Sequence, residues 1–135
     1  KDRTPWRIQE HSGDERVVPI YRQFAKLRMG LIPYLRREAA HCAAAGEPLL
    51  RPLLLDDPGD PAAWQVYDQY RLGRDLLVAP VLEEGAASRR LYLPAGQWRP
   101  FWGDSRHEGP QWVEVPAPLD RIPVFVRAGA EPAAD

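Results

Sequence analysis

The distribution of proline constrains this chain more than any other feature of its sequence. Fifteen of its 135 residues are proline, and most of these follow residue 47, many at the edges of short apolar runs. Proline lacks a backbone N–H and breaks helix interiors, so this pattern favours short strands with rigid connections over long helices. Several runs recur at intervals of about ten residues, which is typical of an antiparallel sandwich or barrel. Strands are expected within 51–55, 75–81, 90–93, 97–102, 111–115 and 122–127.

A different pattern precedes residue 47. Residues 1–14 are polar and lack periodicity, and we expect a loop there. An apolar stripe with intervals of three and four residues then predicts a helix, with Pro19 in its first turn, where the missing N–H costs nothing. Pro33 should kink this helix or start a second one, which ends at Gly46. The stripe consists of Val17, Ile20, Tyr21, Phe24, Leu27 and Leu31.

These patterns predict an α+β fold, with two N-terminal helices followed by an antiparallel β-sandwich. The apolar stripe of the helices needs a covering surface from elsewhere. A net charge of −1 gives no electrostatic footprint for nucleic acid or a membrane surface, and no stretch is long and apolar enough to cross a membrane. The single cysteine, Cys42, excludes an internal disulfide and is expected to be a buried small hydrophobe.

The most recognisable segment is 68–81, Asp-Gln-Tyr-Arg-Leu-Gly-Arg-Asp-Leu-Leu-Val-Ala-Pro-Val. A glycine before an apolar run indicates a tight turn that leads into a buried strand, and Pro80 places the end or edge of that strand. Together with other segments in the same order, it resembles the family 31 glycoside hydrolases, which include α-glucosidases and α-xylosidases. The resemblance covers about residues 14–130, and its other segments are 21–28, 31–35, 51–58, 91–102 and 118–130.

The resemblance implies two domains and a division of labour. Residues 1–46 would be the last loop and helices of a catalytic (β/α)8 barrel, and residues 47–135 the proximal C-terminal β-sandwich domain. The intact enzyme would hydrolyse terminal α-glucosidic or α-xylosidic bonds with retention, and its catalytic aspartates would lie outside this chain. We therefore expect the isolated chain to be inactive and to need no cofactor. Its partners would be the rest of the barrel and, in the intact enzyme, an α-linked oligosaccharide or glycoside.

Other properties stay open at this point. The choice between glucose and xylose, the oligomeric state and the localisation are undecided, with the cytoplasm favoured. After Ala130 the chain continues as Glu-Pro-Ala-Ala-Asp, where the family usually has an apolar segment. Either a distal β-domain is missing or the chain has a native terminus here.

Pairs of carboxylates are the first candidates for chemistry, because retaining glycosidases need two carboxyl groups about 5–5.5 Å apart. Asp56 and Asp57 are expected in a turn. Asp68 and Asp75 are expected to cap or to pair with Arg71 or Arg74. Glu83 and Glu84 are expected in a solvated hairpin loop. All six acids are therefore assigned to structural roles, and no catalytic residue is predicted. The pairs are Asp56 with Asp57, Asp68 with Asp75, and Glu83 with Glu84.

The histidines do not form a predicted site. His11, His41 and His107 are scattered, and no Cys/His/Asp cluster has metal-ligand spacing, so no metal site is expected. In the resembling family, an Arg-X-His motif after the last barrel strand touches the sugar. Arg7 and His11 are separated by three residues and do not match it, so no substrate role is assigned to them.

The five tryptophans leave two alternatives open. Exposed aromatic faces stack on sugar rings, so the chain could be a non-catalytic carbohydrate-binding β-sandwich module. For Trp98 and Trp102 we favour the other alternative, core or interdomain packing.

Trp6 lies in the loop expected at the C-terminal face of the barrel, where active sites gather, and is the residue expected to come nearest to substrate. An interaction or scaffold domain that acts through the helix stripe is a third possibility. The remaining tryptophans are Trp64 and Trp112.

Overall fold

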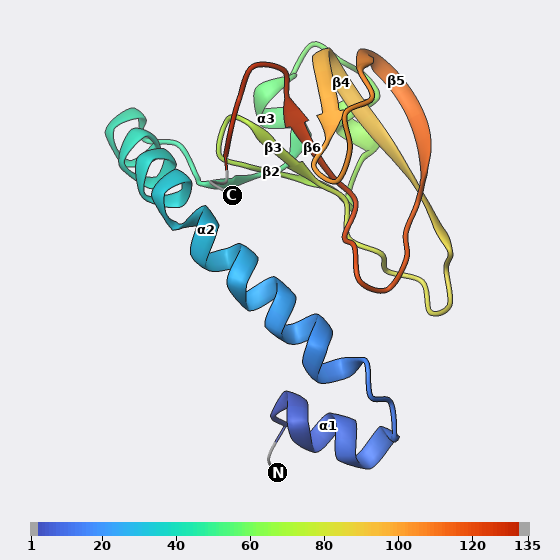
Figure 1. Ribbon diagram of the computed structural model, residues 1–135. Helices are drawn as coiled ribbons and strands as arrows, with labels where there is room; N and C mark the ends of the chain where they lie inside the picture. Colours follow the sequence, from blue (N-terminus) through green and yellow to red (C-terminus); the bar gives the residue numbers. More distant parts are fainter. Residues whose placement is uncertain (1–2, 133–135) are drawn as a thin grey trace.

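A computed structural model describes residues 3–132 and contains two N-terminal helices followed by a β-rich domain (Figure 1). The predicted α+β fold class is confirmed. The helices are α1 (Pro5–Ser12), α2 (Val17–Ala45), the short α3 (Leu53–Asp56) and a 3-10 turn (Ala63–Gln65). The strands are β1 (Leu50–Arg51), β2 (Tyr70–Leu72), β3 (Leu76–Val78), β4 (Ser88–Pro100), β5 (His107–Pro116) and β6 (Val124–Arg127).

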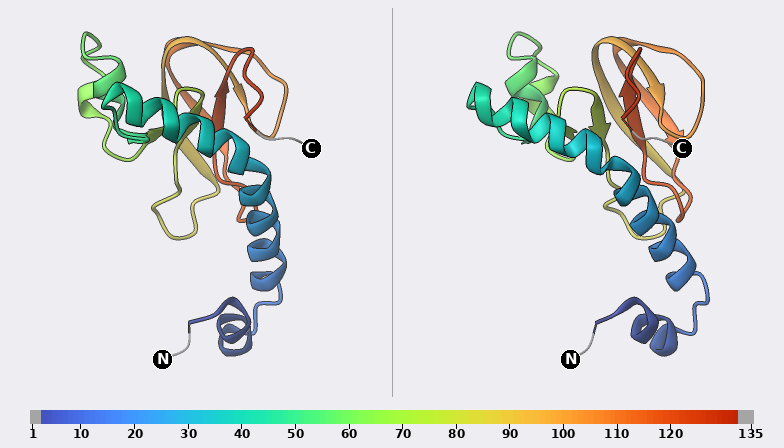
Figure 2. Two further views of the ribbon diagram at one scale, coloured as in Figure 1. Left: turned by 90° about the vertical axis from the view of Figure 1, so that its left-hand side faces the viewer. Right: turned by 60° about the vertical axis from the view of Figure 1, so that its left-hand side comes forward.

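The two N-terminal helices differ in their bounds from those predicted. Helix α2 runs without interruption through Pro33, so the two helices expected after residue 16 are one. Figure 2 shows that α2 bends near its middle, in agreement with the kink that an internal proline produces. The helix ends as expected at Gly46, which adopts the left-handed conformation with φ of 70° and donates its N–H to the carbonyl of Cys42.

Residues 1–14 were expected to be a loop, and this was wrong for α1. Pro5 occupies the first turn of α1, and Gly13 closes the helix in a left-handed conformation with its N–H on the carbonyl of Gln9. No residue of α1 is buried. Periodicity detects a helix through its buried face, so a helix without such a face gives no periodic signal.

The six strands form one antiparallel sheet in the order β1-β2-β3-β6-β4-β5. Strand β4 pairs with β5 over most of its length and with β6 through its last residues, Trp98–Pro100. The runs 90–93 and 97–102 were predicted as separate strands, but both contribute to β4, because Pro94–Gly96 forms a register shift rather than a turn. Run 51–55 is mostly α3 rather than a strand, and β2 was not predicted.

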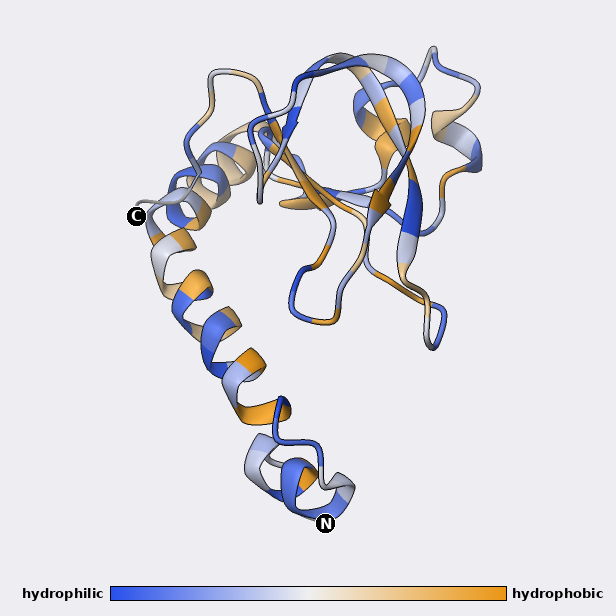
Figure 3. Ribbon diagram, turned by 45° about the vertical axis from the view of Figure 1, so that its right-hand side comes forward, coloured by the Kyte–Doolittle hydropathy of each residue, from blue (hydrophilic) through white to orange (hydrophobic). Residues whose placement is uncertain are grey.

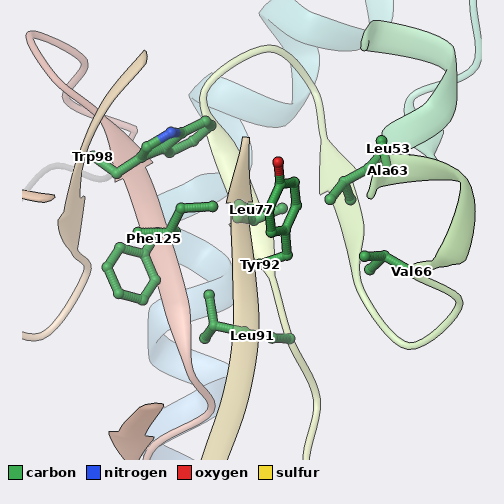
Figure 4. Packing of buried hydrophobic residues seen from close by; sticks show 10 residues of the cluster. Leu53, Ala63, Val66, Leu77, Leu91, Tyr92, Trp98 and Phe125 are labelled. Atoms are coloured by element: carbon green, nitrogen blue, oxygen red, sulfur yellow. The ribbon is translucent and has the colours of Figure 1, made fainter. Parts of the chain in front are cut away.

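The two faces of the central strands contact different parts of the molecule. Leu77 and Phe125 face the main core, which is closed by the β4–β5 hairpin and the segment around the 3-10 turn (Figure 4). Leu76 and Val126 face the opposite way and pack with Tyr34 of α2. The central strands β3 and β6 therefore lie between α2 on one face and the main core on the other.

Trp98 and Trp102 have the packing roles that the sequence favoured. Trp98 is buried in the main core and donates its ring N–H to the carbonyl of Pro94 at 2.9 Å. Trp102 lies edge-on to Phe24 of α2, with ring centroids 6.5 Å apart. Cys42 is also buried, as expected.

Candidate functional site

The C-terminal half of α2 is held to the sheet by a cluster that we call the latch, which comprises Tyr34, Glu38 and the β2–β3 turn, Leu72–Asp75. Glu38 is fully buried, with 0% exposure, and its carboxylate accepts hydrogen bonds from the backbone and guanidinium of Arg74 at 2.9–3.1 Å. The Tyr34 hydroxyl donates to the carbonyl of Leu72 at 2.7 Å and accepts from the backbone N–H of Asp75 at 3.1 Å. Polar contacts at both ends of the turn thus fix the helix to the sheet.

The latch has clear electrostatic consequences. Hydrogen bonds from Arg74 hold the pKa of Glu38 at about 2, below its usual range. Burial raises the pKa of Tyr34 to about 12. Arg37 adds an ion pair with Asp75 at 3.7 Å and contacts Glu38 at 3.2 Å. At neutral pH the latch therefore contains an ionised glutamate and a neutral tyrosine.

Gly73 makes the close approach of α2 to this turn possible. Its φ is +63°, a conformation that favours glycine. A Cβ atom at this position would lie 2.7 Å from both the Glu38 Cγ and the Tyr34 hydroxyl. The glycine that marked the recognisable segment in the sequence therefore serves both turn geometry and helix docking.

A second, weaker attachment lies nearer the N-terminus of α2. Gln23 donates from its side-chain amide to the carbonyl of Asp120 at 3.0 Å, and Phe24 meets Trp102 edge-on. Trp102 is itself fixed by a hydrogen bond from its ring N–H to the carbonyl of Ile122 at 3.0 Å. These contacts connect α2 to the loops before β5 and β6.

Between the two attachments, α2 and the sheet enclose an open groove of about 380 Å³, the helix groove. Its lining is apolar except for the Arg28 side chain and the Tyr70 hydroxyl. The lining residues are Phe24, Leu27, Arg28, Leu31, Tyr70, Leu72, Leu76, Val78, Phe101, Trp102, Ile122 and Val124.

A further apolar surface runs along α2 beside the helix groove. Intervals of three and four residues place Val18, Tyr21, Ala25, Met29 and Ile32 on one side of the helix, and we call them the outer stripe. Tyr21 is 56% exposed and Met29 is 67% exposed. Figure 3 shows hydrophobic residues along the whole length of α2, including the part that extends beyond the sheet. Within residues 3–132, Tyr21, Ala25 and Met29 of this stripe are exposed, whereas Val18 and Ile32 are half-buried.

Buried arginines form a second polar cluster, which sequence reasoning did not anticipate. Arg71 is buried against the Trp98 ring, with the guanidinium carbon 5.1 Å from the ring centre, and Arg127 approaches the same ring at 5.0 Å. Arg51 is also buried and pairs with Glu47 at 2.6 Å. Burial lowers the pKa of Arg71, and the charge of Arg127 acts in the same direction. These three arginines lie on strands β1, β2 and β6 of the β-domain.

The acids considered as catalytic candidates lie in structural positions. Asp68 pairs with Arg89 at 2.7 Å, and Asp75 with Arg37 at 3.7 Å, rather than with the expected arginines 71 and 74. Asp56 ends α3 and lies 3.4 Å from the Arg51 guanidinium, and Glu83 and Glu84 are exposed in the β3–β4 loop. This loop does not join hairpin partners, because β3 pairs with β2 and β6.

The histidines remain separate in the folded chain. His11 and His41 are exposed on different helices, whereas the His107 ring lies 3.1 Å from the Ser105 hydroxyl and edge-on to Phe125. Across residues 3–132, no group of three or more His, Cys, Asp or Glu side chains is placed to hold a metal ion. No helix in this part of the chain has the length and hydropathy of a membrane span.

Comparisons with known proteins agree with this architecture. The family model described as the glycosyl hydrolase family 31 C-terminal domain matches residues 46–130. The chain is 48% identical over 129 residues to the 1,3-alpha-isomaltosidase of Kribbella flavida, covering 95% of this chain and 18% of that protein. It is 31% identical over 127 residues to the alpha-xylosidase of Saccharolobus solfataricus, covering 93% of this chain and 17% of that protein.

A solved structure extends the similarity to the helices. The cycloalternan-degrading enzyme from Trueperella pyogenes in complex with cycloalternan matches with a TM-score of 0.93 at 38% identity, covering 96% of this chain and 18% of that one. The chain thus spans less than a fifth of the length of these relatives. It belongs to glycoside hydrolase family 31, and it corresponds to a C-terminal part of the enzymes of that family.

Proposed function

We propose that this chain is the C-terminal structural portion of a retaining α-glycosidase that hydrolyses terminal α-glucosidic or α-xylosidic bonds. Residues 1–46 would complete the catalytic barrel, and residues 47–135 would form the β-domain next to it. The two carboxyl groups that such an enzyme needs, about 5–5.5 Å apart, would be aspartates elsewhere in the protein. In this chain Asp56, Asp68 and Asp75 are engaged with arginines, and Glu83 and Glu84 lie in an exposed loop. Asp57 is half-buried directly after α3.

The names of the relatives support an α-linked gluco-oligosaccharide as the substrate class. The Kribbella protein is a 1,3-alpha-isomaltosidase, and the Trueperella enzyme was solved with cycloalternan. An alpha-xylosidase is also among the relatives, at lower identity. We therefore favour glucosidic over xylosidic bonds.

The observation that carries the proposal is the uncovered apolar surface of α2. The outer stripe exposes the large side chains of Tyr21 and Met29, and the helix groove leaves an apolar hollow beside it, on a helix whose C-terminal half is held to the sheet. Exposed apolar surface of this extent typically marks an interface. In a barrel, the missing strands and helices would cover it, and the latch would hold α2 in place against the β-domain.

Two protein lengths test the proposal. The purified 135-residue chain should show no turnover of an aryl α-glucoside, whereas a protein that also contains the preceding barrel should hydrolyse it with retention of configuration, followed by NMR of the first-formed sugar. Turnover by the short chain, abolished by mutation of one of its own acids, would contradict the proposal. So would an inactive longer protein.

A non-catalytic sugar-binding module is the second candidate, favoured by the exposed rings of Trp64 and Trp112. The Trp112 ring is already stacked by Arg90, whose guanidinium carbon lies 4.6 Å from the ring centre. Titration of the short chain with maltose or xylose oligosaccharides, followed by tryptophan fluorescence, separates the two candidates. Saturable binding that is lost in Trp64→Ala would favour the module.

A further inference from the structure

Helix α1 is a solvent-exposed element at the N-terminal end of α2. The Gln9 side chain accepts a hydrogen bond from the backbone N–H of Val18 at 3.0 Å and so fixes α1 to the first turn of α2. In the linker, Asp14 accepts from the Arg16 guanidinium at 2.8 and 2.9 Å. Figure 1 shows α1 at the end of α2 that lies away from the sheet. Its position is therefore set by polar contacts rather than by a core.

One side chain on α1 does not fit a simple packing role. Trp6 is 61% exposed, and no residue of the helix is buried. The other large apolar residue, Ile8, lies two positions away, on the opposite side of the helix, so one docking surface cannot cover both. Glu10, one turn after Trp6, is held by Arg7 in an ion pair of 2.8 Å. An exposed indole and an exposed carboxylate–guanidinium pair thus lie on neighbouring parts of the same short helix.

The position of α1 in the chain indicates which face of a barrel the helix would occupy. In a (β/α)8 barrel each helix begins where a βα loop ends, and those loops form the catalytic face. If α2 is the last barrel helix, as proposed above, then α1 belongs to the preceding βα loop and lies on the catalytic face. An indole offers a flat apolar surface to the C–H groups of a pyranose, while a carboxylate and a guanidinium bind its hydroxyls.

We propose that Trp6 forms an aromatic wall for a sugar unit of the substrate beyond the glycosidic bond that is cleaved, with Arg7 and Glu10 beside it. This inference rests on the proposed function. Its occupant is a neutral α-linked oligosaccharide, and Trp6 is a specificity-determining residue rather than a catalytic one. It predicts that substitution of Trp6 lowers kcat/KM for substrates with sugar units beyond the cleaved bond and not for substrates without them.

The test uses the full-length enzyme and two substrates. α-Glucosyl fluoride has no sugar beyond the cleaved bond, whereas isomaltotriose does. In Trp6→Ala, kcat/KM for isomaltotriose should fall at least about tenfold while that for the fluoride stays within about twofold. Trp6→Tyr should recover most of the activity on isomaltotriose. The control Ile8→Ala, on the opposite side of the same helix, should change neither substrate selectively.

Trp6→Leu separates stacking from packing, because leucine keeps apolar bulk but has no aromatic face. It should behave like Trp6→Ala; full activity on isomaltotriose in this variant would overturn the inference. Equal loss on both substrates, or no loss on either, would overturn it too, with the proposed function intact. A wild-type enzyme inactive on both substrates would instead contradict the proposed function itself.

Discussion

The two halves of α2 follow different physical rules. In the C-terminal half, Tyr34, Glu38 and Cys42 are buried, and the latch satisfies the polar atoms of a glutamate with no exposure. In the N-terminal half, Tyr21 and Met29 project into solvent. One continuous helix is therefore held to the β-domain at one end and exposes large apolar side chains at the other.

This contrast teaches where the stability of the chain resides. Contacts in the latch should control unfolding of the β-domain, because they join segments far apart in the sequence, at residues 34–38 and 72–75. The outer stripe should contribute only where a larger protein covers it. Substitutions in the two halves can separate these contributions.

The largest effect is expected from Gly73→Ala. The added Cβ would meet Glu38 and Tyr34 at 2.7 Å, in a backbone conformation that disfavours side chains, so the helix or the turn must move. We expect a loss of about 3 kcal/mol in the free energy of unfolding, measured by urea denaturation of the chain. Gly46→Ala is the matched control: its φ is +70° but nothing lies within 4 Å, so about 1 kcal/mol is expected. Equal losses would refute the role of helix docking.

Glu38→Gln should have the next largest effect. The amide keeps the shape of the side chain but removes the charge that Arg74 binds, and it brings N–H groups toward guanidinium donors. The expected loss is about 2 kcal/mol by the same denaturation measurement. Glu10→Gln, in the exposed ion pair with Arg7, should cost no more than about 1 kcal/mol. If both substitutions cost the same, the latch is no stronger than a surface ion pair.

Glu38 should also give the latch a dependence on pH. Its pKa is about 2 in the folded chain and lies below the ordinary value of 4.5, so the folded state favours the ionised form. The stabilisation is present above the unfolded pKa and is lost as pH falls from about 4.5 toward 2. Wild type should therefore lose more stability than Glu38→Gln between pH 5 and pH 3, as followed by thermal melting. Parallel curves for the two proteins would show that Glu38 does not titrate in this way.

The sequence predicted those elements whose signals are local. Gly46 marks the end of α2, and the segment around Gly73 marks a turn followed by a buried strand, because glycine conformation and apolar runs are properties of a few neighbouring residues. Helix α1 was not predicted because none of its residues is buried. The β4 bulge at Pro94–Gly96 was mistaken for a turn between two separate strands. Local patterns cannot distinguish a bulge from a turn when the pairing partner lies more than ten residues away.

The contacts of the latch could not be predicted from the sequence for the same reason. Glu38 follows two arginines in a polar stretch of the helix and looks like a solvated residue, yet it is fully buried. Its burial is explained by the hydrogen bonds from Arg74, which lies 36 residues later in the sequence. Asp75 was expected to pair with a neighbour in sequence but binds Arg37 on α2. Ion pairs between distant segments depend on tertiary structure, which composition and spacing do not encode.

The smallest effect in the isolated chain is expected for Met29→Gln, in the outer stripe. Glutamine has similar length and helix propensity, so it should change the free energy of unfolding of the 135-residue chain by less than about 0.5 kcal/mol. In a protein that includes the preceding barrel, the same change should cost about 1.5 kcal/mol or more, because the methionine side chain would then be buried. Lys26→Gln, on another side of α2, should stay near zero in both proteins. A Met29 effect that does not grow with chain length would mean that this half of α2 faces solvent in the whole enzyme, and the proposed docking of the helix into a barrel would fail at that point.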